Sequence, residues 1–166
     1  VPGRRGIDQV EFLIAPNPGE PLRPLVRIAS GGEASRIMLA IKTILADADQ
    51  TPVLVFDEID TGVSGRTAVR LGERLSMLAS RHQVFCVTHL AQIASMADQH
   101  LLISKQTDGQ TTYTRLDMLR ETERRGELAR LLSGDSRRNE ALVLAAQLRE
   151  EAEGFKSART KETPPS

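Results

Sequence analysis

Two adjacent carboxylates, Asp57 and Glu58, directly follow the apolar run Val53 to Phe56. A strand that ends there delivers both acids to the rim of a sheet, and the alternation of side chains sends them in different directions. Asp57 suits Mg²⁺, which prefers one or two protein carboxylates together with water and substrate phosphates. Glu58 can then act as the base for a water that attacks a phosphoryl group. In the alternative, both acids cap the next turn or pair with arginines. Two adjacent carboxylates directly after a core strand are costly unless something binds them.

A second segment that could meet a ligand is Ser30, Gly31, Gly32 and Glu33, at the start of an apolar helix. Two glycines let the backbone approach a ligand closely, and the free N–H groups and dipole of a helix N-terminus attract a phosphate. The same residues also fit an ordinary capped start, in which Ser30 is the N-cap and Glu33 completes a capping box. The sequence leaves both interpretations open.

Two more polar segments follow along the chain. Asp60 lies in a turn with two glycines, which also fits an ordinary strand-to-helix loop. Thr88 and His89 directly follow another apolar run, Val84 to Val87. A lone histidine at the end of a strand is usually structural. If the two apolar runs form neighbouring parallel strands, however, His89 lies beside the paired carboxylates, because the carboxyl ends of such strands meet at one edge of the sheet.

The elements that must position these residues alternate between strands and helices. Their order predicts an α/β fold with a mainly parallel sheet flanked by helices, and the short apolar runs predict central strands covered on both faces. We predict one domain over residues 1–153 and a disordered polar tail over 154–166. The first helix, starting near Ser30, is predicted to be deeply buried. The predicted strands are Gln9–Ala15, Val53–Phe56, Val84–Val87, Leu101–Ser104 and Thr111–Leu116, and the predicted helices run from about Ser30 to Ala48, Gly65 to Ala79, Leu90 to Ala97, Glu121 to Leu132 and Asn139 to Glu153.

Composition limits the function further. The chain has 166 residues with 22 basic and 22 acidic side chains, as expected of one soluble globular domain. A net charge of zero argues against nucleic-acid binding through a uniform positive field, and the pairs Arg4–Arg5, Arg124–Arg125 and Arg137–Arg138 are interpreted as solvated surface, with direct DNA contact left open. A single cysteine, Cys86, excludes an intrachain disulfide. Because no apolar stretch approaches the roughly 20 residues of a membrane span, we expect a cytoplasmic protein without a membrane partner.

Taken in series, these segments resemble the C-terminal half of an ABC-type ATPase head. Ala29 to Glu33 resembles the ABC signature, although the family's usual leucine is replaced by Ala29. Val53 to Glu58 resembles the Walker B motif with its catalytic glutamate, Asp60 lies where the D-loop would be, and His89 matches the switch histidine. The runs Phe56 to Ala68 and Val87 to Ala94 are more specifically similar to the RecN family of SMC-like bacterial DNA-repair ATPases.

The resemblance implies ATP and Mg²⁺ as cofactors. It assigns Asp57 to the magnesium shell, Glu58 to the attacking water and His89 to the γ-phosphate of the same protomer. The signature residues Ser30, Gly31, Gly32 and Glu33 would serve the nucleotide held by a second head in an ATP-sandwiched homodimer, and Asp60 would communicate across that interface. DNA would be a partner of the full-length, nucleoid-associated protein.

A further partner follows from what the sequence lacks. None of the four lysines follows a glycine, so the chain has no Gly-Lys step of a P-loop to cradle the β- and γ-phosphates. Since the first residue is Val1, we expect a piece of something longer, whose N-terminal lobe carries the P-loop of the same head. The isolated chain is then expected to be inactive. The alternatives are the head lobe of another SMC-like or ABC DNA-repair ATPase, or a non-catalytic α/β interaction module.

Overall fold

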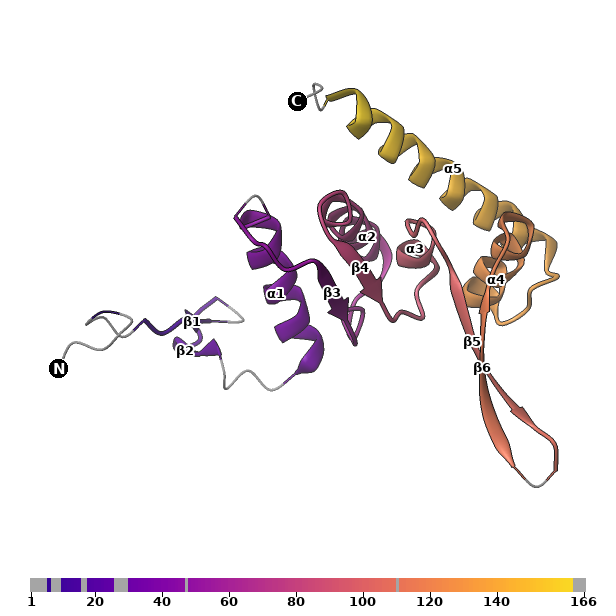
Figure 1. The fold of residues 1–166 in the computed structure, drawn as a ribbon, viewed down its shortest axis with the longest axis horizontal. Coiled ribbons are helices and arrows are strands. Elements are labelled where there is room, and N and C mark those ends of the chain that lie inside the picture. The colour runs from indigo at the N-terminus through magenta and orange to yellow at the C-terminus, as the bar shows by residue number, and fades with distance from the viewer. Residues whose placement is uncertain are drawn as a thin grey trace.

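Helices and short strands alternate along the chain in a computed structural model, which describes Gly6 and residues 10–15, 18–25, 30–46, 48–109 and 111–162 (Figure 1). The strands are β1 (Leu13–Ile14), β2 (Arg23–Pro24), β3 (Val53–Phe56), β4 (Gln83–Cys86), β5 (Leu101–Thr107) and β6 (Thr112–Met118). The helices are α1 (Gly31–Ile44), α2 (Gly65–Leu78), α3 (Ala91–Ala94), α4 (Glu121–Ser133) and α5 (Asn139–Glu162). The α/β class is confirmed. Val1, Arg4, Arg5, Gln9 and Ala29 lie outside the described residues.

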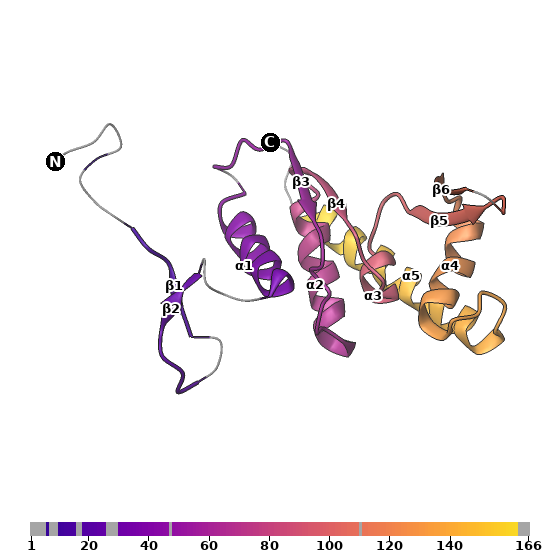
Figure 2. The same cartoon turned by 90° about the horizontal axis from the view of Figure 1, so that it is seen from below.

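Parallel pairing, among the described strands, is confined to β3 and β4. Leu54 lies opposite Val84, and Phe56 lies opposite Cys86. The other two pairs, β1 with β2 and β5 with β6, are antiparallel, so the mixed strand directions differ from the mainly parallel sheet expected. The hairpin of β5 and β6 projects from the body, and β1 and β2 lie apart from it in both views (Figures 1 and 2).

The β3–β4 pair is covered on one face only. Leu54 and Phe56 point into a buried core that also contains Leu39 of α1 and Leu71, Leu75 and Leu78 of α2. The alternate residues on the second face are exposed: Val53, Val55, Phe85 and Val87. The prediction of strands covered on both faces is therefore wrong for the described chain, because no described element packs against the second face.

Helix α1 begins where the sequence predicted but is not deeply buried. Ser30 is its N-cap, and the Ser30 Oγ accepts a hydrogen bond from the Glu33 N–H at 3.1 Å, which is one half of the predicted capping box. Only Gly32 and Leu39 of the helix are buried, and Ile44 is 81% exposed. The reason is its place at the edge of the body, with α2 on one side (Figure 2). The periodicity predicted a helix with apolar residues, but it did not show how many of these residues pack against another element.

The C-terminal helices form a second core. Ala91 and Ala94 of α3 pack with Leu128 and Ala129 of α4 and with two alanines of α5. Helix α5 continues to Glu162, so the prediction of a disordered tail is wrong over 154–162, while 163–166 lies outside the described residues. Two basic side chains tie this last part back to the body: the Lys156 Nζ lies 2.7 Å from the Asp98 Oδ1, and Arg159 donates to the Ser76 carbonyl.

Arg124 is part of the fold rather than of the solvated surface that the sequence suggested. Its side chain is 5% exposed and donates to the carbonyl oxygens of Ala97 at 2.6 Å and Asp98 at 3.1 Å. Arg149 of α5 likewise donates to the Ser95 carbonyl at 2.6 Å. These arginines satisfy backbone oxygens at and after the end of the short helix α3, which has few partners of its own. None of the described helices is both long and apolar enough to cross a membrane.

Replacing Arg124 by alanine should lower the free energy of unfolding by about 2–3 kcal/mol, because two partly buried carbonyl oxygens lose the charged donor of a buried side chain. Arg115→Ala is the matched control, since that exposed guanidinium pairs only with Asp117 in the contacts seen here and its loss should cost about 0.5 kcal/mol or less. Urea unfolding followed by circular dichroism measures both values. Equal losses in the two variants would contradict a structural role for Arg124.

Candidate functional site

Five of the polar residues singled out in the sequence, Asp57, Glu58, Asp60, Thr88 and His89, meet at the carboxyl ends of β3 and β4, whereas Ser30 to Glu33 do not line this place. Seven residues line a hollow of about 260 Å³ there: Asp57, Glu58, Asp60, Thr61, Val87, Thr88 and His89. The parallel pairing of the two strands brings the segment after β3 beside the segment after β4. The prediction that His89 lies beside the paired carboxylates is therefore confirmed.

The loop 57–61 is fixed to α1 by side chains of that helix. The Ser35 Oγ donates to the Asp57 carbonyl at 2.9 Å. The Arg36 Nη1 donates to the carbonyl oxygens of Ile59 at 3.1 Å and Thr61 at 2.8 Å. Because these bonds reach both ends of the loop, its backbone cannot shift without breaking contacts to the helix.

Glu58 has an unusual backbone conformation in this loop. Its φ is 55°, the left-handed region that a non-glycine residue adopts at a cost of order 1–3 kcal/mol unless its surroundings impose it. The contacts from Ser35 and Arg36 on either side supply that constraint. Strain of this kind at a carboxylate beside a hollow is typical of functional residues.

Gly31 and Gly32 lie directly against Glu58 of the same chain. A Cβ on Gly31 would come within 2.5 Å of the Glu58 Oε2, and a Cβ on Gly32 would come within 2.7 Å of the Glu58 carbonyl oxygen and 3.0 Å of the Thr61 Cβ. From the sequence, these glycines fitted either close approach of a ligand or an ordinary capped helix start. The structure gives a reason within the chain: the start of α1 and the acidic loop could not approach this closely with larger residues.

Asp60 is the most strongly bonded acid of the hollow. Its side chain is 4% exposed, and its Oδ2 accepts hydrogen bonds from the Thr88 Oγ1 at 2.6 Å and from the His89 N–H at 2.9 Å. Burial opposes ionisation of this carboxyl, but these hydrogen bonds and the nearby His89 outweigh it and lower the pKa of Asp60 below its ordinary value. Contact of Asp60 with a second protomer stays a prediction.

His89 contributes an exposed ring to the hollow. Its side chain is 74% exposed, and its Nδ1 lies 3.0 Å from the Asp60 Oδ2. The ring is therefore accessible to a ligand on one side and lies close to Asp60 on the other. Thr88 donates a hydrogen bond to Asp60, and its Oγ1 accepts one from the Leu90 N–H at 3.1 Å. Thr88 thereby links Asp60 to the start of α3.

The residues present fit part of a magnesium–nucleotide site. Among the described residues, no three His, Cys, Asp or Glu side chains come together as a metal cluster, so an ion beside Asp57 would need phosphate oxygens and water as its other ligands. That is the coordination that Mg²⁺ prefers. The Asp57 side chain is exposed, and its Oδ1 accepts from the Glu58 N–H at 2.9 Å. The hollow thus offers three carboxylates and an imidazole, and its described lining residues form no phosphate cradle.

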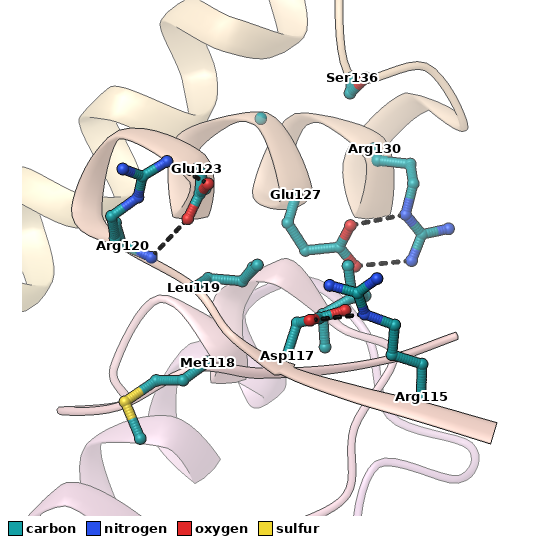
Figure 3. Close-up of a pocket in the computed structure, with 11 residues that line it drawn as sticks. Arg115, Asp117, Met118, Leu119, Arg120, Glu123, Glu127, Arg130 and Ser136 are labelled. Atoms are coloured by element: carbon teal, nitrogen blue, oxygen red, sulfur yellow. Dashed lines mark hydrogen bonds and ion pairs between the residues drawn. The ribbon is translucent and has the colours of Figure 1, made fainter. Parts of the chain in front are cut away.

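A larger hollow of about 670 Å³ lies between the β5–β6 hairpin and α4 (Figure 3). Its three arginines are each paired with an acid that also lines it: Arg115 with Asp117, Arg120 with Glu123, and Arg130 with Glu127. The Arg130–Glu127 contact has two hydrogen bonds, at 2.6 and 2.7 Å. Because its cations are neutralised by neighbours, this hollow does not resemble a phosphate site.

Ser35, Arg36 and Thr88 were not among the predicted site residues. Ser35 and Arg36 follow Gly32 by three and four positions, which places all three on one face of a helix. Polar residues on the loop-facing side of an otherwise apolar helix are a signal that could have identified them. Thr88 was noted only as the neighbour of His89.

Gly32→Ala should destabilise the chain by about 1–3 kcal/mol, because the new Cβ meets the backbone of Glu58 and the Cβ of Thr61, which cannot move freely. Gly31→Ala is the matched control. Its Cβ meets only the end of the flexible Glu58 side chain, and the better helix propensity of alanine offsets part of the cost. Thermal or urea unfolding compares the two, and a Gly31 variant at least as unstable as the Gly32 variant would refute this packing.

Cys86 should react slowly while the chain is folded. Burial, together with the charges of Asp60 and Asp57, raises the pKa of its thiol to about 12. Near pH 8 the reactive thiolate is then about a thousandfold rarer than in the unfolded chain. Iodoacetamide labelling read by mass spectrometry, with and without urea, tests this, and equal rates in the two conditions would contradict it.

Comparison with known proteins gives close relatives. The chain is 47% identical over 146 residues to the DNA repair protein RecN of Treponema pallidum (strain Nichols), covering 88% of this chain and 26% of the relative. It is 46% identical over 150 residues to that of Streptomyces coelicolor, covering 90% and 26%. The Bacillus subtilis (strain 168) protein is 49% identical over 131 residues, covering 78% and 23%. The chain therefore spans about a quarter of the length of the curated relatives it matches.

Other comparisons add less. No protein-family model matches the chain. A solved structure described under ATP-driven dimerization and DNA stimulated activation of SMC ATPases aligns with a TM-score of 0.44 at 21% identity, over 65% of this chain and 71% of that chain. A likeness this weak supports no conclusion. The sequence identities do: the chain belongs to the RecN family and corresponds to the C-terminal part of its members.

Proposed function

We propose that this chain is the C-terminal part of an ATP-hydrolysing, SMC-like head in a protein of DNA double-strand-break repair and recombination. The observation that carries the proposal is the meeting of Asp57, Glu58 and His89 in one hollow at the ends of paired parallel strands. The names of its relatives, DNA repair protein RecN, supply the biological setting.

Each acid of the hollow has a distinct task in this proposal. Asp57, exposed at the end of β3, binds Mg²⁺, which when bound with ATP neutralises phosphate charge. Glu58, in its constrained backbone conformation, accepts the proton of the attacking water. His89 places its exposed ring against the γ-phosphate side of the hollow.

The N-terminal part of the same protein is the first partner in this proposal. It supplies the P-loop that the sequence lacks. Two features of the fold support such a partner. The second face of β3 and β4 carries exposed apolar side chains, with Val55 69% exposed, and burial of such a face is strongly favourable. Among the described strands, β4 pairs only with β3, so its other edge can accept another strand.

A second head is the other partner. Ser30, Gly31, Gly32 and Glu33 form the start of α1, where the helix dipole favours a phosphate. In the proposed dimer these four residues face the nucleotide bound by the opposite head. Hydrolysis therefore requires two heads. The full-length protein engages DNA as a consequence of the association of its heads. Ser30 is only partly buried, as this role requires.

The test is a chimera in which this chain replaces the matching C-terminal part of the Bacillus subtilis relative, to which it is 49% identical. The chimera should hydrolyse ATP, whereas the chain alone should not. Glu58→Gln should lower kcat by about 10²–10⁴ while ATP still binds, because the general base is lost. Glu140→Gln, which makes the same change at an exposed site on α5, is the control and should leave kcat unchanged.

Normal turnover by the Glu58 variant would refute its role as the base. A folded chimera that neither binds nor hydrolyses ATP would instead favour the non-catalytic interaction module.

A further inference from the structure

We propose that Asp60 is a positioning residue, which sets the tautomer and the direction of the His89 ring within its own chain. This inference rests on the proposed function, since it assigns Asp60 to the support of the switch histidine. It differs from the role across the head interface that the family resemblance suggested. The juxtaposition that carries it is a single buried carboxylate oxygen facing both the backbone and the ring of His89.

Two hydrogen bonds and one close ring contact converge on a single carboxylate oxygen. The Asp60 Oδ2 lies 2.6 Å from the Thr88 Oγ1, 2.9 Å from the His89 backbone nitrogen and 3.0 Å from the His89 Nδ1. The contact to the backbone N–H holds the main chain of His89 in place, and the contact to Nδ1 restricts the rotation of the ring. Together these contacts leave the His89 side chain few alternative conformations, although it is largely exposed.

Asp60 itself is held firmly enough to orient another residue. Its side chain is 4% exposed, so its carboxylate does not present a free face to a nucleotide or to a second head. The carbonyl oxygens of the residues on either side, Ile59 and Thr61, accept hydrogen bonds from the Arg36 Nη1 of α1. Ile59 is fully buried in the core. The carboxylate is therefore anchored through its backbone on both sides.

The chemical consequence concerns which ring nitrogen is free. A carboxylate accepts hydrogen bonds, so the His89 Nδ1 carries a proton toward Asp60 whether the ring is neutral or charged. The Nε2 is then the nitrogen available to a group in the hollow. Without Asp60 the ring could turn or exchange its tautomer, and a phosphate oxygen would meet the wrong atom in a fraction of molecules.

The direct test is nitrogen NMR of the ¹⁵N-labelled chain at about pH 8.5, where an ordinary imidazole is largely neutral. In the wild type the proton of the neutral His89 ring should reside on Nδ1. Asp60→Ala should move the tautomer ratio to that of the urea-unfolded chain, whereas Asp60→Asn, which keeps an acceptor oxygen, should retain part of the preference. His82, whose Nδ1 contacts the Thr51 carbonyl at 2.7 Å, is the internal control.

A wild-type ratio equal to that of the unfolded chain would overturn the proposal, and so would an Asp60→Ala ratio equal to the folded wild type. If Asp60→Ala does not fold, the wild-type ratio and the Asp60→Asn ratio still decide. Asp117→Asn, the same change within an exposed ion pair of β6, should leave the His89 ratio unchanged.

A double-mutant cycle in the chimera gives the second readout. Asp60→Ala should lower kcat about tenfold or more with KM for ATP nearly unchanged, and should have no further effect when His89 is already alanine. Losses that simply add would indicate a role independent of His89 and overturn the proposal. If the chimera with Asp60 intact has no ATPase activity, the proposed function fails, and the tautomer ratio alone decides the role of Asp60.

Discussion

The anchoring of loop 57–61 is the constraint on which the site depends. Ser35 and Arg36 bind its backbone from α1, and Asp60 binds the segment after β4 through Thr88 and His89. The loop thereby joins a helix start, a strand end and a histidine that are distant in sequence. Its position also imposes the left-handed conformation of Glu58, so geometry at one residue depends on contacts made by others.

Much of this arrangement could be predicted from the sequence. Apolar runs of four residues that end in polar groups identified β3 and β4 within one position, and their adjacency brought Asp57, Glu58 and His89 together. These predictions rest on local pattern and on the geometry of parallel strands. The start of α1 also followed from local capping chemistry.

Other features could not be predicted, because they depend on which groups meet in space. Apolar periodicity does not reveal whether a face is covered, and so the exposure of Val55 and Ile44 was missed. The charge of Arg124 suggested a solvent-exposed side chain, but its guanidinium donates hydrogen bonds to carbonyl oxygens after α3. Helix α5 exceeds its predicted end, and Lys156 and Arg159 bind the body from that extension. Gly31 and Gly32 suggested a ligand, whereas the structure also shows Glu58 beside them.

The central claim is that Glu58 of one head and Ser30 of another complete the same nucleotide site. Mixing two inactive chimeras tests it most directly, one carrying Ser30→Arg and the other Glu58→Gln. A mixed dimer then holds one site with both residues intact and one with both altered, so ATP hydrolysis should return on mixing. If both residues serve a site within their own chain, every site in the mixture is defective, and an ATPase rate that stays at the level of the separate variants would contradict the account.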